Sequence, residues 1–318
     1  MHRTNLPQLS GARLLTDGGI ETDLLFHHGI ELPHMATYVL LETDAGRAQL
    51  HQYFAGYLAL ADEYRAGLLL DSATWRANPD WAERIGTPRA RLADVNRQAI
   101  DFLQMQRQRR SYRAAPTVIS GAMGPRGDAY RPDSLMQVDE AAEYHAPQIE
   151  AFHRSGADLA TAYTLTNIPE AAGIARAAAA IGMPVAISFT LETDGRLPTG
   201  PTLREAVEQV DALTQTAPAY YMINCAHPTH FQGALESGQP WAQRIRGVRA
   251  NSSRKSHAEL DESPALDEGN PQELGGEIRD LVADHPQLCV LGGCCGTDLR
   301  HIREIAAACL GGQGERPS

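Results

Sequence analysis

Short apolar segments recur along the chain, and each gives way to small or polar residues and then to a helix-like stretch. Eight of these segments have the length and composition of a buried β-strand. They occupy residues 12–19, 67–74, 116–124, 157–164, 184–190, 219–226, 245–251 and 288–295. Strands that are buried on both faces are continuously apolar, and their alternation with helices favours parallel pairing.

The helix-like stretches between the strands lie at residues 47–66, 93–110, 141–156, 168–182 and 202–217. Eight strand–helix units predict an α/β fold, namely a single (β/α)8 TIM barrel that takes in residues 1–318 as one domain. The length alone would also permit two ordinary domains, and composition does not distinguish the two arrangements. We expect the C-terminal tail, about residues 311–318, to be mobile.

One long segment departs from this alternation. Residues 256–275, after the seventh predicted strand, are rich in acidic side chains. We interpret this segment as a solvated loop, with partial covering of an active site as the alternative.

Composition and charge exclude several classes of partner. The net charge of −11 argues against binding to nucleic acid. No uninterrupted apolar run reaches the roughly 18 to 20 residues that a membrane span needs, and the first residues lack the pattern of a secretory signal. The odd number of cysteines, five, favours a reducing compartment, so we expect a cytoplasmic protein with small-molecule partners. The oligomeric state stays open.

In this fold the active site forms at the carboxyl ends of the strands. The predicted strands place there Asp17, Gly18, Gly19, Trp75, Tyr163, Asn224, Cys225, Cys294 and Cys295. Three of the five cysteines therefore meet at one rim, while Cys289 and Cys309 are interpreted as packing residues. Neighbouring cysteines fit disulfide geometry poorly, which favours free thiols at positions 294 and 295.

Three thiolates on a rigid rim match Zn²⁺, which accepts tetrahedral sulfur ligands. A catalytic zinc keeps its fourth position open, and here the fourth ligand is absent or uncertain; His227 is a competing candidate. The alternative is a set of buried thiols with no metal. Thr297 and Asp298 are predicted to cap the last helix, with its positive end favouring a thiolate at Cys295.

The sequence resembles the homocysteine S-methyltransferases, which include betaine- and S-methylmethionine-dependent enzymes. The resemblance covers nearly the whole chain, and it rests on TDGGIETDLL, ATWRANPD, SGAMGPRGD, ISFTLETDGRLPTG, INCAHP and GGCCGTD. It implies that Cys225, Cys294 and Cys295 bind zinc. It also implies that the turn at residues 17–19 contacts the amino-acid part of the thiol substrate.

These observations predict a zinc-dependent S-methyltransferase of methionine biosynthesis. A thiol at the open zinc position loses its proton, and its sulfur can attack a methyl group on a sulfonium or quaternary ammonium donor. No catalytic residue beyond the zinc site is predicted, and the sequence does not name the donor. The alternatives are a zinc hydrolase on the same barrel, which would favour histidine and carboxylate ligands, and a non-catalytic thiol- or metal-binding protein.

Three further residues are candidates for substrate contacts. The family usually has a Glu-Thr pair at the end of strand four, whose carboxylate helps to hold the substrate ammonium, and here Tyr163 precedes Thr164. We therefore expect homocysteine to be a poorer substrate than a thiol without the amine, unless another group such as Asp17 binds it, and Tyr163→Glu to favour homocysteine. Trp75 can face a cationic donor, and Asn224 can orient the cysteine that follows it.

Overall fold

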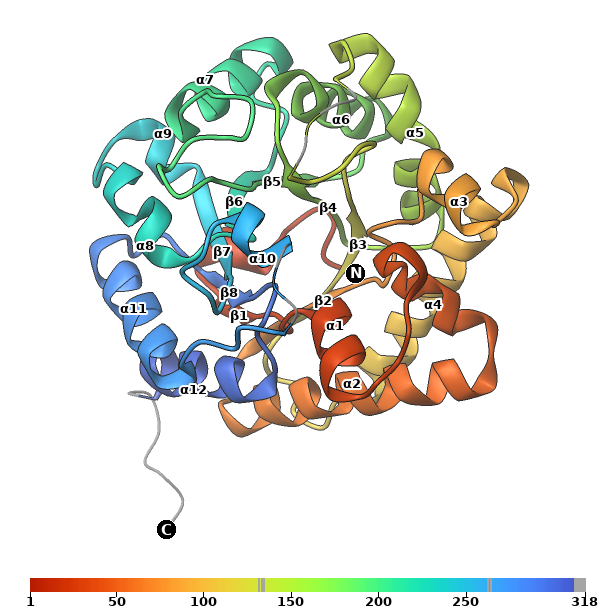
Figure 1. Cartoon of the computed structure of the whole chain (residues 1–318), viewed down its shortest axis with the longest axis horizontal. Helices are drawn as coiled ribbons and strands as arrows, with labels where there is room; N and C mark the ends of the chain where they lie inside the picture. The colour runs from red at the N-terminus through yellow and green to blue at the C-terminus, as the bar shows by residue number, and fades with distance from the viewer. Residues whose placement is uncertain (131, 133–134, 262, 264, 312–318) are drawn as a thin grey trace.

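Eight parallel strands form a closed barrel in the computed structural model, which describes residues 1–130, 132, 135–261, 263 and 265–311 (Figure 1). Each strand pairs with the next, and β1 pairs with β8 to close the barrel. The strands are β1 (Leu14–Leu15), β2 (Gly67–Asp71), β3 (Thr117–Met123), β4 (Leu159–Leu165), β5 (Val185–Phe189), β6 (Tyr220–Asn224), β7 (Ile245–Ala250) and β8 (Val290–Gly293). The predicted (β/α)8 barrel is confirmed.

The longer helices form a ring around the outside of the barrel (Figure 1). They are α2 (Asp44–Glu63), α4 (Leu92–Arg109), α5 (Val138–Arg154), α6 (Ile168–Ile181), α7 (Leu203–Thr214), α11 (Pro271–Asp284) and α12 (Leu299–Leu310). Shorter helices lie in the connections: α1 (Ile20–Thr22), α3 (Pro79–Ile85), α8 (Pro228–Phe231), α9 (Pro240–Gln243) and α10 (His257–Asp261). Among the described residues, no helix is long and apolar enough to cross a membrane.

The helix ends follow from local capping. Thr43 accepts a hydrogen bond from the backbone of Gly46, so α2 begins three residues before the predicted start at residue 47. Thr202 and Glu205 form a capping box at the start of α7. Asn270 caps α11, and the last part of the predicted 256–275 loop is therefore helical.

The strands separate two apolar clusters because successive side chains point to opposite faces. On β2, Leu69 belongs to a cluster that includes Val118, Leu159 and Tyr220 from other strands, and this cluster fills the barrel. Its neighbour Leu68 joins the larger cluster between the strands and the helices. The predicted tail lies outside the described residues apart from Gly311.

Candidate metal and substrate site

The three strand-end cysteines lie together at the carboxyl rim of the barrel. Cys225 follows β6, Cys294 and Cys295 follow β8, and their three Sγ atoms lie within 4.8 Å of one another. The Sγ atoms of Cys225 and Cys295 are 3.4 Å apart. In the described chain this is the single group of three or more such side chains that could hold a metal ion, and it contains no histidine or carboxylate. An all-sulfur donor set of this kind fits a soft or borderline ion such as Zn²⁺.

The other two cysteines lie elsewhere, as expected. The Cys289 Sγ faces the backbone carbonyl of Gln8 at 3.1 Å, at the amino end of β8. Cys309 lies in α12 and packs against the core. Burial raises the pKa of each thiol to about 11, so both remain protonated at neutral pH.

The glycines beside the cysteines allow two strand ends to approach closely. A Cβ atom on Gly19 would collide with the backbone carbonyl of Cys294, and one on Gly18 would lie 2.7 Å from the carbonyl oxygen of Thr297. The backbone N–H of Gly19 donates to that same Thr297 oxygen at 2.9 Å. The turn after β1 therefore packs against the loop that carries Cys294 and Cys295. This structural role leaves substrate contact by Gly18 and Gly19 as a prediction.

Asn224 connects several strands beneath the cysteines. Its Oδ1 accepts hydrogen bonds from the Thr164 backbone at 2.8 Å and from the Ser188 hydroxyl at 2.7 Å. Its Nδ2 donates to the Thr164 hydroxyl and lies 3.8 Å from the Cys294 Sγ. Cys225 follows with a φ of 56°, in the left-handed region that costs a non-glycine residue energy. Asn224 thus holds the backbone that aims Cys225 into the cluster.

The metal-free cluster favours a thiolate at Cys294. Hydrogen bonds from Cys225 and Cys295, aided by the Arg249 charge, hold the pKa of Cys294 well below its usual range. The contact with Cys294 raises the pKa of Cys225, and the contacts with Cys225 and Cys294 raise the pKa of Cys295. The prediction for Cys295 is therefore wrong in its position. Asp298 does cap α12, by accepting from the Arg300 backbone at 2.8 Å.

Thr297 and His227 do not have the roles considered for them. The Thr297 hydroxyl donates to the Cys294 carbonyl at 2.7 Å and does not cap α12. The His227 ring caps α8, with Nδ1 2.9 Å from the Thr229 hydroxyl and Nε2 3.2 Å from Glu277. Burial lowers the pKa of His227 to about 4. His227 is therefore a helix cap and not a member of the cysteine cluster.

A cavity of about 520 Å³ opens above the cysteines. Its lining includes all three of them together with the predicted contacts Asp17, Trp75, Tyr163 and Asn224. Leu260, Ser263, Ala265, Leu266 and Asp267 also line it. These residues belong to the acidic segment after β7, so the interpretation of that segment as a solvated loop is wrong for this part.

Arg249, on β7, binds the two aspartates Asp17 and Asp71, which form the acidic floor of the cavity. Its guanidinium donates to Asp17 at 2.7 Å and to Asp71 at 2.6 Å, and it also bonds the Gly18 carbonyl at 2.8 Å. Burial alone would lower its pKa, but the charges of Asp17 and Asp71 raise it. Burial raises the pKa of Asp17 to about 6 despite this partner. No separate signal in the sequence marks Arg249, because it is one of two arginines in this predicted strand.

Tyr130 and His257 are two more residues that the sequence did not reveal. The Tyr130 hydroxyl lies 2.9 Å from the Cys225 Sγ and 3.7 Å from that of Cys295. Its ring stacks on His257, with centroids 4.2 Å apart. The His257 Nε2 lies 2.7 Å from the Cys225 carbonyl oxygen. The acidic segment therefore supports the cluster through His257.

A protein family, curated relatives and solved structures are similar to this chain. A family model described as homocysteine S-methyltransferase matches residues 14–309. This chain belongs to the homocysteine S-methyltransferase family. Homocysteine S-methyltransferase of Escherichia coli strain K12 is 27% identical over 198 residues, which are 59% of this chain and 61% of that relative. Homocysteine S-methyltransferase YbgG of Bacillus subtilis strain 168 is 25% identical over 197 residues, 60% of this chain and 61% of that relative.

The chain thus spans about 61% of the length of these curated relatives. Among solved structures, the oxidized form of the Escherichia coli homocysteine methyltransferase MmuM has a TM-score of 0.71 at 23% identity and covers 93% of this chain and 95% of its own. The metallated form has a TM-score of 0.71 at 22% identity, with 95% and 98% covered. At these identities the solved structures establish the shared fold.

Tyr163 is the point at which this member of the homocysteine S-methyltransferase family departs from the expected pattern. Its hydroxyl donates to Asp71 at 2.7 Å, and the Arg249 guanidinium lies 5.1 Å from its ring centroid. Tyr163 therefore binds protein groups that also hold the acidic floor. A glutamate at this position would place a further carboxylate beside Asp71. The predicted effect of Tyr163→Glu on substrate preference stays a prediction.

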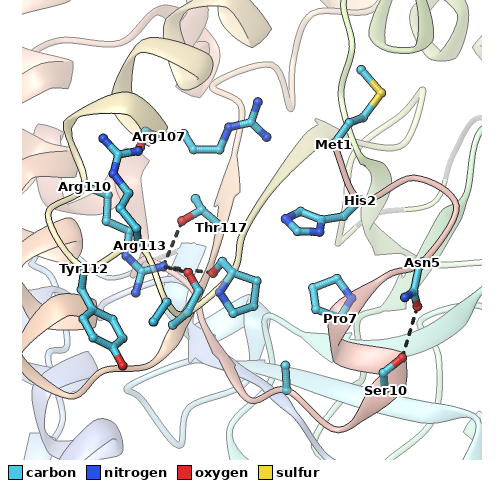
Figure 2. Close-up of a pocket in the computed structure, with 14 residues that line it drawn as sticks. Met1, His2, Asn5, Pro7, Ser10, Arg107, Arg110, Tyr112, Arg113 and Thr117 are labelled. Atoms are coloured by element: carbon cyan, nitrogen blue, oxygen red, sulfur yellow. Dashed lines mark hydrogen bonds between the residues drawn. The ribbon is translucent and has the colours of Figure 1, made fainter.

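A second cavity, of about 610 Å³, lies between the N-terminal segment and the start of β3 (Figure 2). Its three arginines have protein partners. Arg107 pairs with Asp158 at 3.2 Å, Arg110 pairs with Asp62 at 2.8 Å, and Arg113 donates to the carbonyl of Arg107 at the end of α4. Arg110 also donates to the Thr117 hydroxyl at 2.9 Å, a hydrogen bond that is drawn as a dashed line in Figure 2. None of the predicted site residues lines this cavity.

Proposed function

We propose that this protein transfers a methyl group from a small sulfonium or quaternary ammonium donor to the sulfur of homocysteine, and that the reaction depends on Zn²⁺. Cys225, Cys294 and Cys295 would hold the ion. The observation that carries this proposal is the cluster of three sulfur atoms within 4.8 Å of one another on the wall of a 520 Å³ cavity. Membership of the family and the names of the relatives support the choice of thiol.

The chemistry assigns distinct tasks to the metal and to the chain. Zn²⁺ would supply a ligand position at which a thiol loses its proton while its sulfur stays nucleophilic. The sulfur–carbon bond forms as the bond from the methyl carbon to the donor breaks, and the electron pair of that bond stays on the donor's sulfonium sulfur or ammonium nitrogen, which loses its positive charge. The chain fixes the cysteines through Asn224 and His257. Its cavity holds both reactants together, which lowers the entropic cost of their encounter.

Trp75 supports a cationic donor in this proposal. Its indole lines the cavity, and the Arg76 guanidinium already lies 3.9 Å from its ring centroid. The cavity wall is therefore an environment in which a cation contacts an aromatic face. Direct contact between Trp75 and the methyl donor is part of the proposal.

A methyl-transfer assay tests the function. Zinc-loaded protein is incubated with L-homocysteine and a methyl-labelled donor, either S-methyl-L-methionine or betaine, and labelled methionine is measured by mass spectrometry. We expect labelled methionine with one of these donors, loss of activity after chelation, and recovery when zinc is restored. Cys309→Ala should behave as the unmodified protein, whereas Cys294→Ala should be inactive. Zinc-loaded, folded protein that leaves homocysteine unmethylated with both donors would contradict the proposal.

A further inference from the structure

One carboxylate of the cavity has no charged partner. Glu21, in α1, lines the cavity, and its Oε1 accepts a hydrogen bond from the Thr37 hydroxyl at 3.1 Å. Within the described part of the chain, no arginine, lysine or histidine forms an ion pair with Glu21. Burial raises its pKa to about 7, and the charges of Cys294 and Asp17 add to this effect. A shielded carboxylate without a counter-ion is costly, and a cationic group on a ligand would offset that cost.

The two other acids near it already have a charged partner. Asp17 and Asp71 share the Arg249 guanidinium, at 2.7 Å and 2.6 Å. Asp17 also accepts from the Tyr53 hydroxyl at 3.0 Å, and Asp71 accepts from Tyr163. The second oxygen of Asp71 is buried without a hydrogen-bond partner in the described chain. Of these three carboxylates, Glu21 is the one that lines the cavity without an arginine partner.

Arg76 offers the complementary charge on the same cavity. Its guanidinium lies between two indoles, 3.9 Å from the Trp75 ring centroid and 3.6 Å from that of Trp81. The two rings cover its faces and leave its edges for hydrogen bonds. Its hydrogen bond to the Gly127 carbonyl is long, at 3.4 Å, and its Nε is buried without an acceptor in the described chain. A guanidinium edge is well suited to bind a carboxylate through two parallel hydrogen bonds.

The charge on Arg76 is retained at neutral pH. Burial lowers its pKa to about 10, while the charges of Asp128 and Glu21 oppose this effect. Glu21 and Arg76 therefore act on each other electrostatically across the cavity that the cysteines line. A negative and a positive group on one cavity wall match a zwitterion.

We propose that Glu21 and Arg76 recognise the two charged groups of an α-amino acid thiol, with Glu21 accepting hydrogen bonds from its ammonium and Arg76 donating to its carboxylate. The sulfur of that ligand lies toward the cysteine cluster. This inference rests on the proposed function and specifies how its substrate is selected. It also gives the ammonium a carboxylate partner in a chain that has tyrosine at the end of β4.

Three thiols that differ by one charged group test the assignment. L-Homocysteine carries both groups, 4-mercaptobutanoate lacks the amine, and 3-mercaptopropylamine lacks the carboxylate. Binding of each to zinc-loaded protein is measured by calorimetry. Glu21→Gln should weaken binding of the two amines by about ten- to a hundredfold and leave 4-mercaptobutanoate unchanged. Arg76→Gln should weaken the two carboxylates by a similar factor and leave 3-mercaptopropylamine unchanged.

Arg84→Gln is the matched control, because Arg84 also stacks on Trp81, at 4.6 Å, but does not line the cavity. Elemental analysis verifies that each variant retains its metal. Equal weakening of all three thiols by either variant, or no weakening of homocysteine, would overturn the inference while methyl transfer by the unmodified protein stands. Failure of the unmodified protein to bind homocysteine while it binds another thiol would overturn it as well. Binding of no thiol at all would remove the proposed function together with this inference.

Discussion

The individual residues of the site are groups whose burial would be unfavourable if each stood alone, and their mutual contacts reduce that cost. Three thiols converge within 4.8 Å, and one arginine holds two buried aspartates. Glu21 stays without an ion pair in the described chain. Such arrangements cost folding free energy, and proteins usually retain them where a ligand or metal completes the site.

Replacing the cysteines one at a time should separate ligands from packing residues. Cys225→Ala, Cys294→Ala and Cys295→Ala each remove one of the clustered sulfurs, so zinc content should fall from about one per chain to a small fraction of that. Cys289→Ala and Cys309→Ala should retain their zinc. Elemental analysis of the purified variants measures this. Loss of zinc from the second pair with retention in the first three would refute the ligand assignment.

Glu21 should make the metal-free protein less stable at high pH. Its pKa is about 7 in the folded protein against 4.5 when free, so the folded state holds the proton more tightly, and this contribution to stability is lost as the pH rises from about 4.5 through 7. Glu21→Gln should therefore be more stable than the unmodified protein at pH 8 by about 1–2 kcal/mol, since some exposure to the cavity reduces the effect, and similar to it near pH 4.5. Urea denaturation at both pH values measures the difference.

Glu143→Gln, on the exposed face of α5, should show no such pH dependence. A stability difference for Glu21→Gln that is equal at both pH values would show that the carboxylate charge is not its cause.

Tyr163 should contribute to stability through its hydroxyl. Tyr163→Phe removes the 2.7 Å hydrogen bond to the buried Asp71 carboxylate and should lower the free energy of unfolding by about 1–3 kcal/mol. Tyr57→Phe is the control, because the Tyr57 hydroxyl is buried without a hydrogen-bond partner in the described chain. Chemical denaturation compares them. An equal effect of the two substitutions would mean that the contact with Asp71 contributes nothing.

At the scale of elements, the site depends on the seam between the first and last strands. β1 is only two residues long, and the contact continues beyond it through the hydrogen bond from the Gly293 N–H to the Asp17 carbonyl at 3.1 Å. The turn at residues 17–19 and the loop after β8 approach closely because both carry glycines. The seam therefore closes the barrel and positions two of the three cysteines.

A methyl group at this seam should damage both stability and metal binding. Gly19→Ala places a Cβ atom against the Cys294 carbonyl and should lower the free energy of unfolding by about 1–3 kcal/mol, with a parallel fall in zinc content. Gly233→Ala should change neither quantity, because no atom lies within 4 Å of the added Cβ. Denaturation and elemental analysis on both variants test this. Normal zinc content in Gly19→Ala would show that the seam does not position Cys294.

The sequence predicted the elements better than the contacts between them. Continuous apolar runs locate buried strands, and rare cysteines at strand ends are conspicuous, so the barrel and the sulfur cluster could both be anticipated. The role of Arg249 could not be anticipated from the sequence, because its partner Asp17 is 232 residues away and the two meet only in the closed barrel. The thiolate was expected at Cys295 from the helix end, but the hydrogen bonds that favour Cys294 depend on three-dimensional positions.

At the scale of the whole molecule, the two ends of the barrel differ in chemistry. The carboxyl end holds the cysteines, the acidic floor and the Glu21 and Arg76 side chains around one cavity of about 520 Å³. The second cavity is lined by arginines that are bound to neighbouring protein groups. The net charge of the chain is −11. The proposed chemistry depends on the charged groups of this one cavity and not on the overall electrostatic field of the protein surface.

In the proposed mechanism, three cysteines hold zinc and present it to an amino-acid thiol. X-ray absorption at the zinc edge, recorded with and without L-selenohomocysteine, tests it most directly. We predict three sulfur neighbours at about 2.3 Å in both samples and a selenium neighbour only when the ligand is present. L-Selenomethionine, whose selenium carries a methyl group, is the matched control and should add no selenium neighbour. Zinc without three sulfur neighbours, or bound selenohomocysteine whose selenium stays away from the metal, would contradict the account.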